Sequence, residues 1–278
     1  MKKGMKMKKY VILTNDDGIH SKGLKILYNA IKDIAEVFVI APAIEKSGAS
    51  HSLTVWDVIK VKKVKFEDTY AYSVYGSPAD CAKIALLTLA KRKPDLLISG
   101  TNHGPNICQF ILYSGTIGAA AEGARMNIPS VSFSVDNFNP DDFSFAKKII
   151  KKIIKLVFNK KIKIKKGTVL NVNIPYLNEN KIKGIKVIKA GNIEYKEMYK
   201  VQKKKKILFF RHIIGKKNPN RKINNDAQAL MKGYVTITPL KFDFNDYDNI
   251  KQLKKYFKSN ASVMGGDNKN RKSFLISL

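Results

Sequence analysis

Two adjacent carboxylates stand at the end of a short apolar run near the start of the sequence. Asp16 and Asp17 follow the β-branched run Tyr10–Thr14 and precede Gly18. On a regular strand the two side chains would point to opposite faces, but at a strand end that leads into a glycine turn both can be aimed at one point. Two carboxylates brought together repel each other, and a hard cation relieves that repulsion. The pair is therefore a candidate metal site, and a helix cap formed by Asn15 and Asp16 is the alternative interpretation.

Further polar segments follow other apolar runs of the sequence. Ser47–Ser52 comes after the run at 37–41, Gly100–Gly104 comes after the run at 95–99, and Tyr113–Thr116 opens an alanine-rich stretch. Ligands of an open parallel sheet bind beyond the carboxyl ends of its strands, so we expect these segments and the Asp16-Asp17 pair to share one rim. Oxygen ligands without a Cys or His cluster suit Mg²⁺ or Mn²⁺ better than zinc.

The start of the alanine-rich stretch has the features of an anion site. Ser114 and Thr116 supply hydroxyl groups, and the start of the helix expected at 114–126 supplies free backbone N–H groups. Both features and the helix dipole suit a phosphate group. An ordinary N-cap is the alternative, and the two roles are compatible.

The remaining polar and aromatic candidates have weaker signals. Of the four histidines, His51 and His103 lie in the candidate rim segments, and we expect them to be exposed or hydrogen-bonded. His103, which follows Asn102, is the histidine to test as a catalyst. Trp56 is expected to pack in the interior, and the border of a base pocket is the alternative.

Several classes of enzyme lack their sequence signatures here. The sequence contains no G-x-x-x-x-G-K-[ST] loop and no G-x-G-x-x-G after the first apolar run, which argues against P-loop NTPases and dinucleotide-binding enzymes. It has no G-x-S-x-G elbow of an α/β-hydrolase. The acidic pair is D-D and not D-x-D, so an aspartyl-phosphate phosphatase is not indicated.

Apolar runs with strand and helix periodicity alternate along the first part of the chain. The runs at 10–14 and 37–41 flank a stretch in which Leu24, Leu27 and Ile31 recur at helical spacing. Such alternation predicts βαβ units and a parallel sheet. It continues with helices expected at 77–91, 114–126 and 142–158 and strands at 95–99, 130–134 and 168–174. We therefore expect an α/β fold with a Rossmann-like three-layer core and a mainly parallel sheet.

The second half of the chain has a different character. Apolar runs separated by charged turns at 182–211 predict β-hairpin excursions, and a strand at 234–238 is expected to end at Pro239. A helix expected at 250–257 is followed by a polar tail with an apolar end at 274–278. We divide the chain into a catalytic core at 9–165, a core completion with hairpin extensions at 166–245, and a C-terminal helix and tail at 246–278.

The composition is globular and strongly basic. Hydrophobic residues make up 44% of the chain, and 52 Lys+Arg against 22 Asp+Glu give a net charge of +30. This balance favours an anionic partner, but the lysines are scattered, as is typical of solvated faces. No nucleic-acid-binding motif with interleaved aromatic residues is present, so we do not expect nucleic acid as a partner.

The cysteines and the N-terminus bear on location. Cys81 and Cys108 form no C-x-x-C pair, which is typical of a reduced, cytoplasmic protein. The apolar run from Tyr10 to Leu13 is too short for a signal peptide or a transmembrane helix. We expect a cytoplasmic protein that does not associate with a membrane.

The candidate segments together resemble the survival protein E (SurE) family of 5′-nucleotidases. The matches occur in the family's order over about residues 10–240, and seven ordered segments are far more specific than any one of them. They are Leu13–Gly18, Ala41-Pro42 with Ser47–Leu53, Gly76–Cys81, Ser99–Asn102 with Gly104, Leu112–Thr116 with Ala119–Gly123, Leu170–Pro175, and Asp226-Ala227 with Gly233–Pro239. Ser77 stands where the family usually has Thr, which keeps a hydroxyl cap.

The resemblance implies metal-dependent hydrolysis of nucleoside 5′- and 3′-monophosphates, and for some members hydrolysis of short polyphosphate. It places the ligands of one divalent cation per subunit, Mg²⁺ or Mn²⁺ with Co²⁺ as a further option, on Asp16, Asp17, Ser47 and Asn102. It places phosphate contacts on Ser114, Gly115 and Thr116. It also implies a homodimer or tetramer formed by exchange of C-terminal elements.

These residues suggest a mechanism for phosphate release. We hypothesise that a cation held by Asp16, Asp17, Ser47 and Asn102 coordinates a phosphate oxygen and activates a water, while Asn102 and the 114–116 turn hold the other oxygens. An aspartate then takes the water's proton, assists the leaving alkoxide or attacks directly, and the sequence leaves these options open. The alternatives are an exopolyphosphatase and, in a different class, a non-catalytic nucleic-acid-binding protein.

Overall fold

A nine-stranded sheet with the order β3-β4-β2-β1-β5-β6-β7-β11-β8 organises the chain. The structure is a computed structural model that describes residues 8–191, 196–215 and 224–259. The sheet is mainly parallel, with antiparallel pairs at β3-β4 and β7-β11. Its strands are β1 (Lys9–Thr14), β2 (Ala35–Pro42), β3 (Val61–Phe66), β4 (Thr69–Val74), β5 (Leu96–His103), β6 (Ser130–Val135), β7 (Thr168–Ile174), β8 (Gly184–Val187) and β11 (Tyr234–Lys241).

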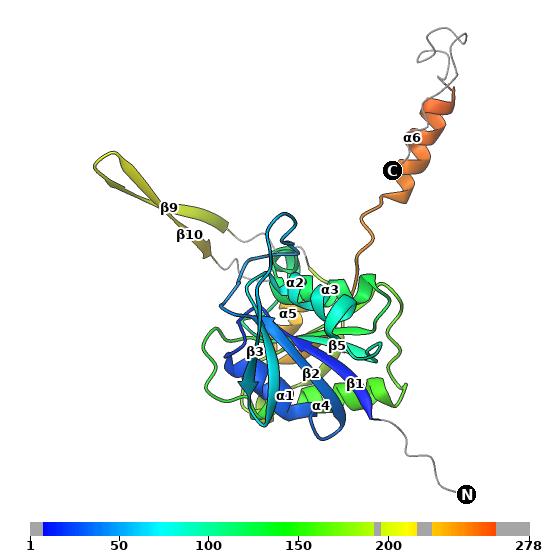
Figure 1. Cartoon of the computed structure of the whole chain (residues 1–278). Coiled ribbons are helices and arrows are strands. Elements are labelled where there is room, and N and C mark those ends of the chain that lie inside the picture. The colour runs from blue at the N-terminus through cyan, green and yellow to red at the C-terminus, as the bar shows by residue number, and fades with distance from the viewer. Residues whose placement is uncertain (1–7, 192–195, 216–223, 260–278) are drawn as a thin grey trace, which may run out of the picture. The chain divides into compact units, whose positions relative to one another are not determined.

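Helices cover both faces of this sheet, which explains why its central strands are apolar on both sides. Figure 1 shows α1 and α4 on one face and α2 and α3 on the other. Accordingly, one buried cluster joins α1 and α4 to the sheet, and a second joins α2 and α3 to its opposite face. The helices are α1 (Lys22–Ile31), α2 (Pro78–Ile84), α3 (Gly115–Arg125), α4 (Ser144–Phe158) and α5 (Asp226–Met231). The expected α/β fold with three layers is confirmed.

Side-chain caps fix where the helices begin. Ser77 accepts a hydrogen bond from the Asp80 backbone N–H at 3.0 Å, and Asp80 accepts one from the Ser77 backbone N–H at 2.8 Å, a reciprocal capping box. Pro78 occupies the first turn, as expected from the sequence. Ser114 caps α3 by accepting from the Ile117 N–H at 3.1 Å, so the predicted anion site is a capped helix start.

Two strands run well past their expected ends. β5 continues past Ser99 to His103, because Asn102 and His103 pair with β6 after a register shift. Pro239 does not end β11, which runs on to Lys241. β8 pairs with β11 only up to Ile237, so the missing N–H of Pro239 falls where that edge has no neighbouring strand. The hairpin formed by β3 and β4 was not predicted.

The predicted hairpin excursion is present as β9 (Lys196–Lys204) and β10 (Ile207–Gly215), which form a separate two-stranded antiparallel sheet. Residues 243–278 make a second unit whose described part contains α6 (Tyr247–Ser259). The apolar end at 274–278 lies outside the described residues. Among the described helices, none has the length and hydropathy needed to cross a membrane.

Candidate metal and phosphate site

A cleft of about 830 Å³ lies at the carboxyl ends of β1, β5 and β6. The structure therefore brings together at one rim segments that are far apart in the sequence, as the parallel sheet predicts. Five of the seven predicted site residues line this cleft: Asp16, Asp17, Ser47, Asn102 and Ser114. The other two, Gly115 and Thr116, are buried in the first turn of α3.

Asp16 is buried against the start of α3. Its carboxylate accepts a hydrogen bond from the Thr116 hydroxyl. A Cβ added to Gly115 would lie 2.9 Å from the Asp16 Cβ, so only glycine lets the helix approach this closely. Burial raises the pKa of Asp16 to about 6, although the hydrogen bond from Thr116 partly offsets the rise. In this structure Thr116 therefore orients an aspartate, and its predicted contact with phosphate stays a prediction.

Asp17 carries a buried carboxylate oxygen that points to a missing ligand. Its Oδ2 is buried and has no hydrogen-bond partner among the described residues. Burial, the Asp16 carboxylate and the nearby Glu45 together raise the pKa of Asp17 to about 8. Such crowding of carboxylates is costly in an empty site and is relieved by a bound cation. The donor set of this cleft fits a hard divalent cation.

Glu45 is a residue of the cleft that the sequence analysis missed. It lines the cleft, and its Oε1 accepts a hydrogen bond of 2.6 Å from the Ser47 hydroxyl. The Lys46 backbone N–H donates to the Asp16 carbonyl at 2.8 Å and ties this loop to the end of β1. The available signal was its place two residues before Ser47, just ahead of the segment Ser47–Ser52 that was assigned to the rim. Glu45 adds negative charge to the set of oxygen ligands.

Asn102 presents its amide to the cleft from the end of β5. Its Nδ2 donates to the Gly104 carbonyl at 2.7 Å, which fixes the orientation of the amide. The amide oxygen is thereby left as a possible ligand. Asn102 thus has the geometry of an oxygen ligand or a phosphate-orienting group.

The two rim histidines have different surroundings. The Nε2 of His51 lies 2.8 Å from the Glu122 carboxylate, so His51 anchors its loop to α3 and does not line the cleft. His103 does line the cleft, and burial lowers the pKa of its imidazole. Its Nε2 is buried without a partner among the described residues. A neutral ring of this kind is able to accept a proton.

A buried polar ladder supports the far side of the cleft. The backbone N–H of Asn106 donates to Asn173 Oδ1 at 2.7 Å, and its Nδ2 donates to Ser134 Oγ at 2.9 Å. The Asn106 carbonyl accepts from Asn171 at 2.7 Å. These contacts explain the two asparagines inside the otherwise apolar β7. They hold the segment after β5 firmly against β6 and β7.

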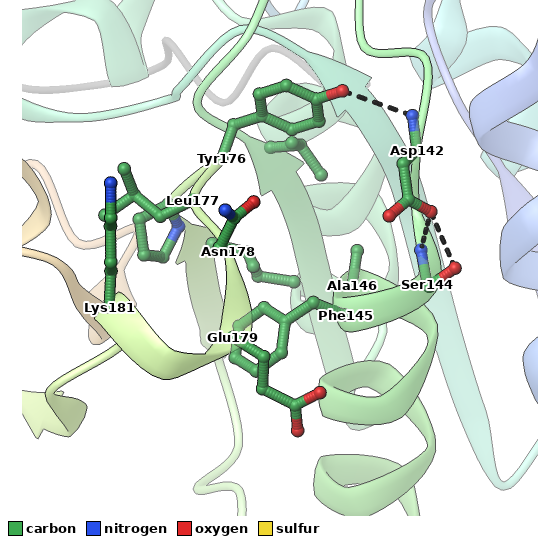
Figure 2. A pocket seen from close by; sticks show the side chains of 12 residues that line it. Asp142, Ser144, Phe145, Ala146, Tyr176, Leu177, Asn178, Glu179 and Lys181 are labelled. Atoms are coloured by element: carbon green, nitrogen blue, oxygen red, sulfur yellow. Dashed lines mark hydrogen bonds between the residues drawn. The ribbon is translucent and has the colours of Figure 1, made fainter.

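A second, smaller hollow of about 410 Å³ lies beside the carboxyl ends of β6 and β7 (Figure 2). None of the predicted site residues lines it. The Tyr176 hydroxyl accepts hydrogen bonds from the backbone N–H groups of Asp141 and Asp142 at 3.1 and 3.2 Å. The Asp142 carboxylate in turn accepts from the Ser144 hydroxyl and backbone N–H. These bonds brace the loop between β6 and α4.

Trp56 is neither a packing residue nor a border of the cleft. Its side chain is 95% exposed, and it is absent from the lining of the cleft. The expectation that it packs in the interior was wrong. The loop that carries it is anchored at Thr54, whose hydroxyl donates to Asp80 at 2.7 Å, and this leaves the next residues outside the core.

Comparisons with known proteins identify the family of this chain. Residues 11–197 match the family described as Survival protein SurE. The 5′-nucleotidase SurE of Syntrophomonas wolfei is 39% identical over 258 residues, which cover 92% of this chain and 97% of that protein. The 5′-nucleotidase SurE of Clostridium beijerinckii is 40% identical over 250 residues, 89% of this chain and 98% of that protein. The crystal structure of the SurE protein from Aquifex aeolicus matches with a TM-score of 0.78 and 36% identity, covering 89% of this chain and 99% of that one. The chain therefore belongs to the Survival protein SurE family.

Proposed function

We propose that this protein is a metal-dependent phosphomonoesterase that hydrolyses nucleoside 5′-monophosphates to nucleosides and phosphate. The observation that carries the proposal is the unsatisfied, buried Oδ2 of Asp17 next to Asp16, in a cleft that also receives the start of α3. A cation and a phosphate group are the complementary ligands of such a site. The relatives named 5′-nucleotidase SurE support the choice of substrate.

The ligands of the cation in this proposal are Asp16, Asp17, Ser47 and Asn102, one site per subunit. Mg²⁺ and Mn²⁺ suit these oxygen donors, and Co²⁺ is a further option. When bound, a divalent cation neutralises charge that develops on the phosphate and lowers the pKa of a water molecule. All of these residues lie within the core proposed at 9–165.

The chain's own groups would hold the phosphate and move protons. The Ser114 hydroxyl and the free N–H groups at the start of α3, including those of Gly115 and Thr116, bind phosphate oxygens. The Asn102 amide orients another oxygen. Asp16, which accepts a hydrogen bond from Thr116, and Asp17 hold the cation, and one of these two carboxylates accepts the proton of the attacking water. His103 lies in the same cleft and is the histidine to test for a part in proton transfer.

The test is a phosphate-release assay with AMP, with and without EDTA, across Mg²⁺, Mn²⁺ and Co²⁺. We expect activity only with metal, and a loss of at least about 100-fold in both Asp16→Asn and Asp17→Asn. Near wild-type phosphate release by both purified variants would rule out the mechanism. Folding of each variant is checked by its thermal unfolding.

The same assay separates the other candidate activities. A 3′-monophosphate and short polyphosphate test the wider substrate range that the family resemblance implies. A non-catalytic nucleic-acid-binding protein would release no phosphate under any metal, and it would bind DNA or RNA with a steep salt dependence.

We also propose that the protein works in the cytoplasm as a homodimer or tetramer. Both cysteines, Cys81 and Cys108, are free and buried, in keeping with a reducing compartment. The hairpin β9-β10 pairs with no other strand of the described residues, and it carries these exposed apolar residues: Tyr199, Val201, Ile207, Leu208, Phe209 and Phe210. Tyr199, Val201, Leu208 and Phe210 share one face of the ribbon by their register, and exposed apolar faces are typical of subunit contacts. Light scattering of the full chain and of a variant with Leu208→Lys and Phe210→Lys tests this proposal.

A further inference from the structure

The cleft that holds the proposed metal site also has an aromatic side. Phe110, Tyr113 and Phe138 line it together with Pro105 and Ile107. Tyr113 is 56% exposed and Phe138 is 81% exposed. Single exposed aromatic rings are common on protein surfaces, but a group of them in the same cleft as a phosphate site is typical of a ligand pocket. The cleft thus offers polar oxygens and flat apolar surface to one ligand.

The exposed ring of Phe138 packs against the backbone of Gly104. A Cβ added to Gly104 would lie 2.5 Å from Cε1 and 2.8 Å from Cδ1 of the Phe138 ring, so the ring rests directly on the glycine backbone. Gly104 is two residues beyond Asn102, and its carbonyl accepts the Asn102 amide hydrogen bond of 2.7 Å. Because Gly104 is two residues from Asn102, the Cα atoms of these two residues are at most about 7.6 Å apart. The ring therefore lies on the backbone that also orients a proposed metal and phosphate ligand.

The loop that carries Phe138 is braced on both sides. Before it, the Asp136 backbone N–H donates to the Ile174 carbonyl at 2.9 Å. Around it, the Asn137 side chain accepts from the Asn139 N–H at 2.9 Å and closes a local turn. After it, the Tyr176 hydroxyl receives the N–H groups of Asp141 and Asp142, as Figure 2 shows for Asp142. An aromatic ring held in this way loses little freedom when a ligand stacks on it.

We propose that Phe138 is the stacking surface for the nucleobase of the substrate, and that Tyr113 and Phe110 complete the aromatic side of the base pocket. This inference rests on the proposed function, because it assigns the part of the cleft that the phosphate group leaves open. Stacking accepts every base, since each base has a π-face. A purine covers more of the ring than a pyrimidine does. The pocket therefore favours purine nucleotides without reading the identity of the base closely.

The experiment compares substrates that share the phosphate group and differ in the base. The full-length wild type, Phe138→Ala and Phe138→Trp are assayed with AMP, CMP and ribose 5-phosphate, each with saturating Mn²⁺. We expect Phe138→Ala to lower kcat/KM for AMP about tenfold, mainly through KM, with a smaller loss for CMP. Ribose 5-phosphate, which has no base, should be hydrolysed by Phe138→Ala within about twofold of wild type. Phe138→Trp should restore the preference for AMP.

A matched control is Trp56→Ala, which removes an exposed aromatic ring from outside the cleft and should change no substrate. Inhibition by adenosine gives an independent reading, because adenosine has a base but no phosphate group: its inhibition constant should rise in Phe138→Ala. Equal losses for AMP and ribose 5-phosphate, or an unchanged KM for AMP, would overturn the inference. Failure of the proposed function looks different, since the wild type would then release phosphate from neither AMP nor ribose 5-phosphate.

Discussion

The Nε2 of His51 lies 2.8 Å from Oε1 of Glu122, a buried carboxylate in the middle of α3. Arg125 donates to the other oxygen of the same carboxylate at 3.1 Å. A Cβ added to Gly118 would lie 2.5 Å from the Ser50 carbonyl oxygen, so the loop also touches the helix backbone closely. The loop that carries Ser47 is thus fastened to the helix whose first turn forms the proposed phosphate site. One rigid element positions both parts of the site.

We expect Glu122→Gln to destabilise the fold by about 1–3 kcal/mol at pH 7, because it weakens two hydrogen bonds to a charged group. Burial alone would raise the pKa of Glu122, but the hydrogen bonds from His51 and Arg125 outweigh it and lower this pKa from 4.5 to about 2. A carboxylate with a lowered pKa in the folded state stabilises the fold at pH above its unfolded value, and this contribution is lost as the pH falls from about 4.5 through about 2. The difference between wild type and variant in urea unfolding should therefore shrink between pH 5 and pH 2.

The matched control for this prediction is Glu36→Gln. Glu36 pairs with Arg92 at 3.1 Å on the surface, and such pairs contribute at most about 1 kcal/mol. A difference for Glu122→Gln that is constant with pH, or no larger than that of Glu36→Gln, would contradict the proposed anchoring role.

The hydrogen bond from Thr116 to Asp16 predicts different effects for two conservative substitutions. Thr116→Val keeps the shape of the side chain but removes the donor from a buried carboxylate, at a cost of about 1–3 kcal/mol. We expect Mn²⁺ affinity and phosphate release to fall about tenfold or more. Thr116→Ser keeps the hydroxyl and should stay within about threefold of wild type. Titration calorimetry with Mn²⁺ measures the affinity without relying on turnover, and equal behaviour of both variants would show that the hydroxyl does not act through Asp16.

The arrangement of the rim was predictable because parallel strands place their carboxyl ends together. The apolar runs before Asp16, Ser47 and Asn102 were enough to bring these residues to one edge. The same rule holds for Ser114, which caps a helix that starts at this edge. Local sequence carries this information, since strand and helix periodicity extend over only a few residues.

The contacts across the site were not predictable in the same way. The partner of Thr116 is Asp16, one hundred residues earlier, and no local pattern specifies a pair at that separation. Glu45 looks like any exposed carboxylate of a loop until its distance to Ser47 is known. Trp56 was predicted to be buried because most tryptophans are, but the loop that carries it is held at Thr54 by Asp80 and leaves the Trp56 ring in solvent. Pro239 was predicted to end its strand because proline lacks the N–H that a neighbouring strand needs. The sequence does not show that β8 is too short to reach Pro239, which leaves that position without a neighbour on this side among the described strands.

Metal removal should make the protein sensitive to alkaline pH through Asp17. Burial, Asp16 and Glu45 raise the pKa of Asp17 from 3.8 to about 8 in the metal-free fold. A carboxylate with a raised folded pKa destabilises the fold increasingly as the pH rises from its unfolded value through its folded one. We therefore expect Asp17→Asn in EDTA to be more stable than wild type at pH 8, by on the order of 2 kcal/mol after allowance for solvent screening, and to lose this advantage near pH 4.

Thermal unfolding in EDTA across this pH range measures the effect, and added Mn²⁺ provides the control. The cation should stabilise wild type much more than Asp17→Asn, because only the wild type offers both carboxylates. Equal stability of the two proteins in EDTA at pH 4 and at pH 8 would mean that Asp17 is not held in a destabilising environment.

Tyr176→Phe tests whether the loop that carries Phe138 must be braced for the base to bind. The substitution removes the acceptor of the Asp141 and Asp142 N–H groups but keeps the aromatic ring in its hollow (Figure 2). Without these hydrogen bonds the loop must become ordered when a base stacks on it, which costs free energy, so KM for AMP should rise several-fold. The kcat for AMP and the hydrolysis of ribose 5-phosphate should stay close to wild type. Tyr70→Phe, at an exposed tyrosine outside both hollows, is the matched control. A parallel loss on AMP and ribose 5-phosphate would instead indicate that Tyr176 supports the phosphate site, since only a contact with the base separates these two substrates.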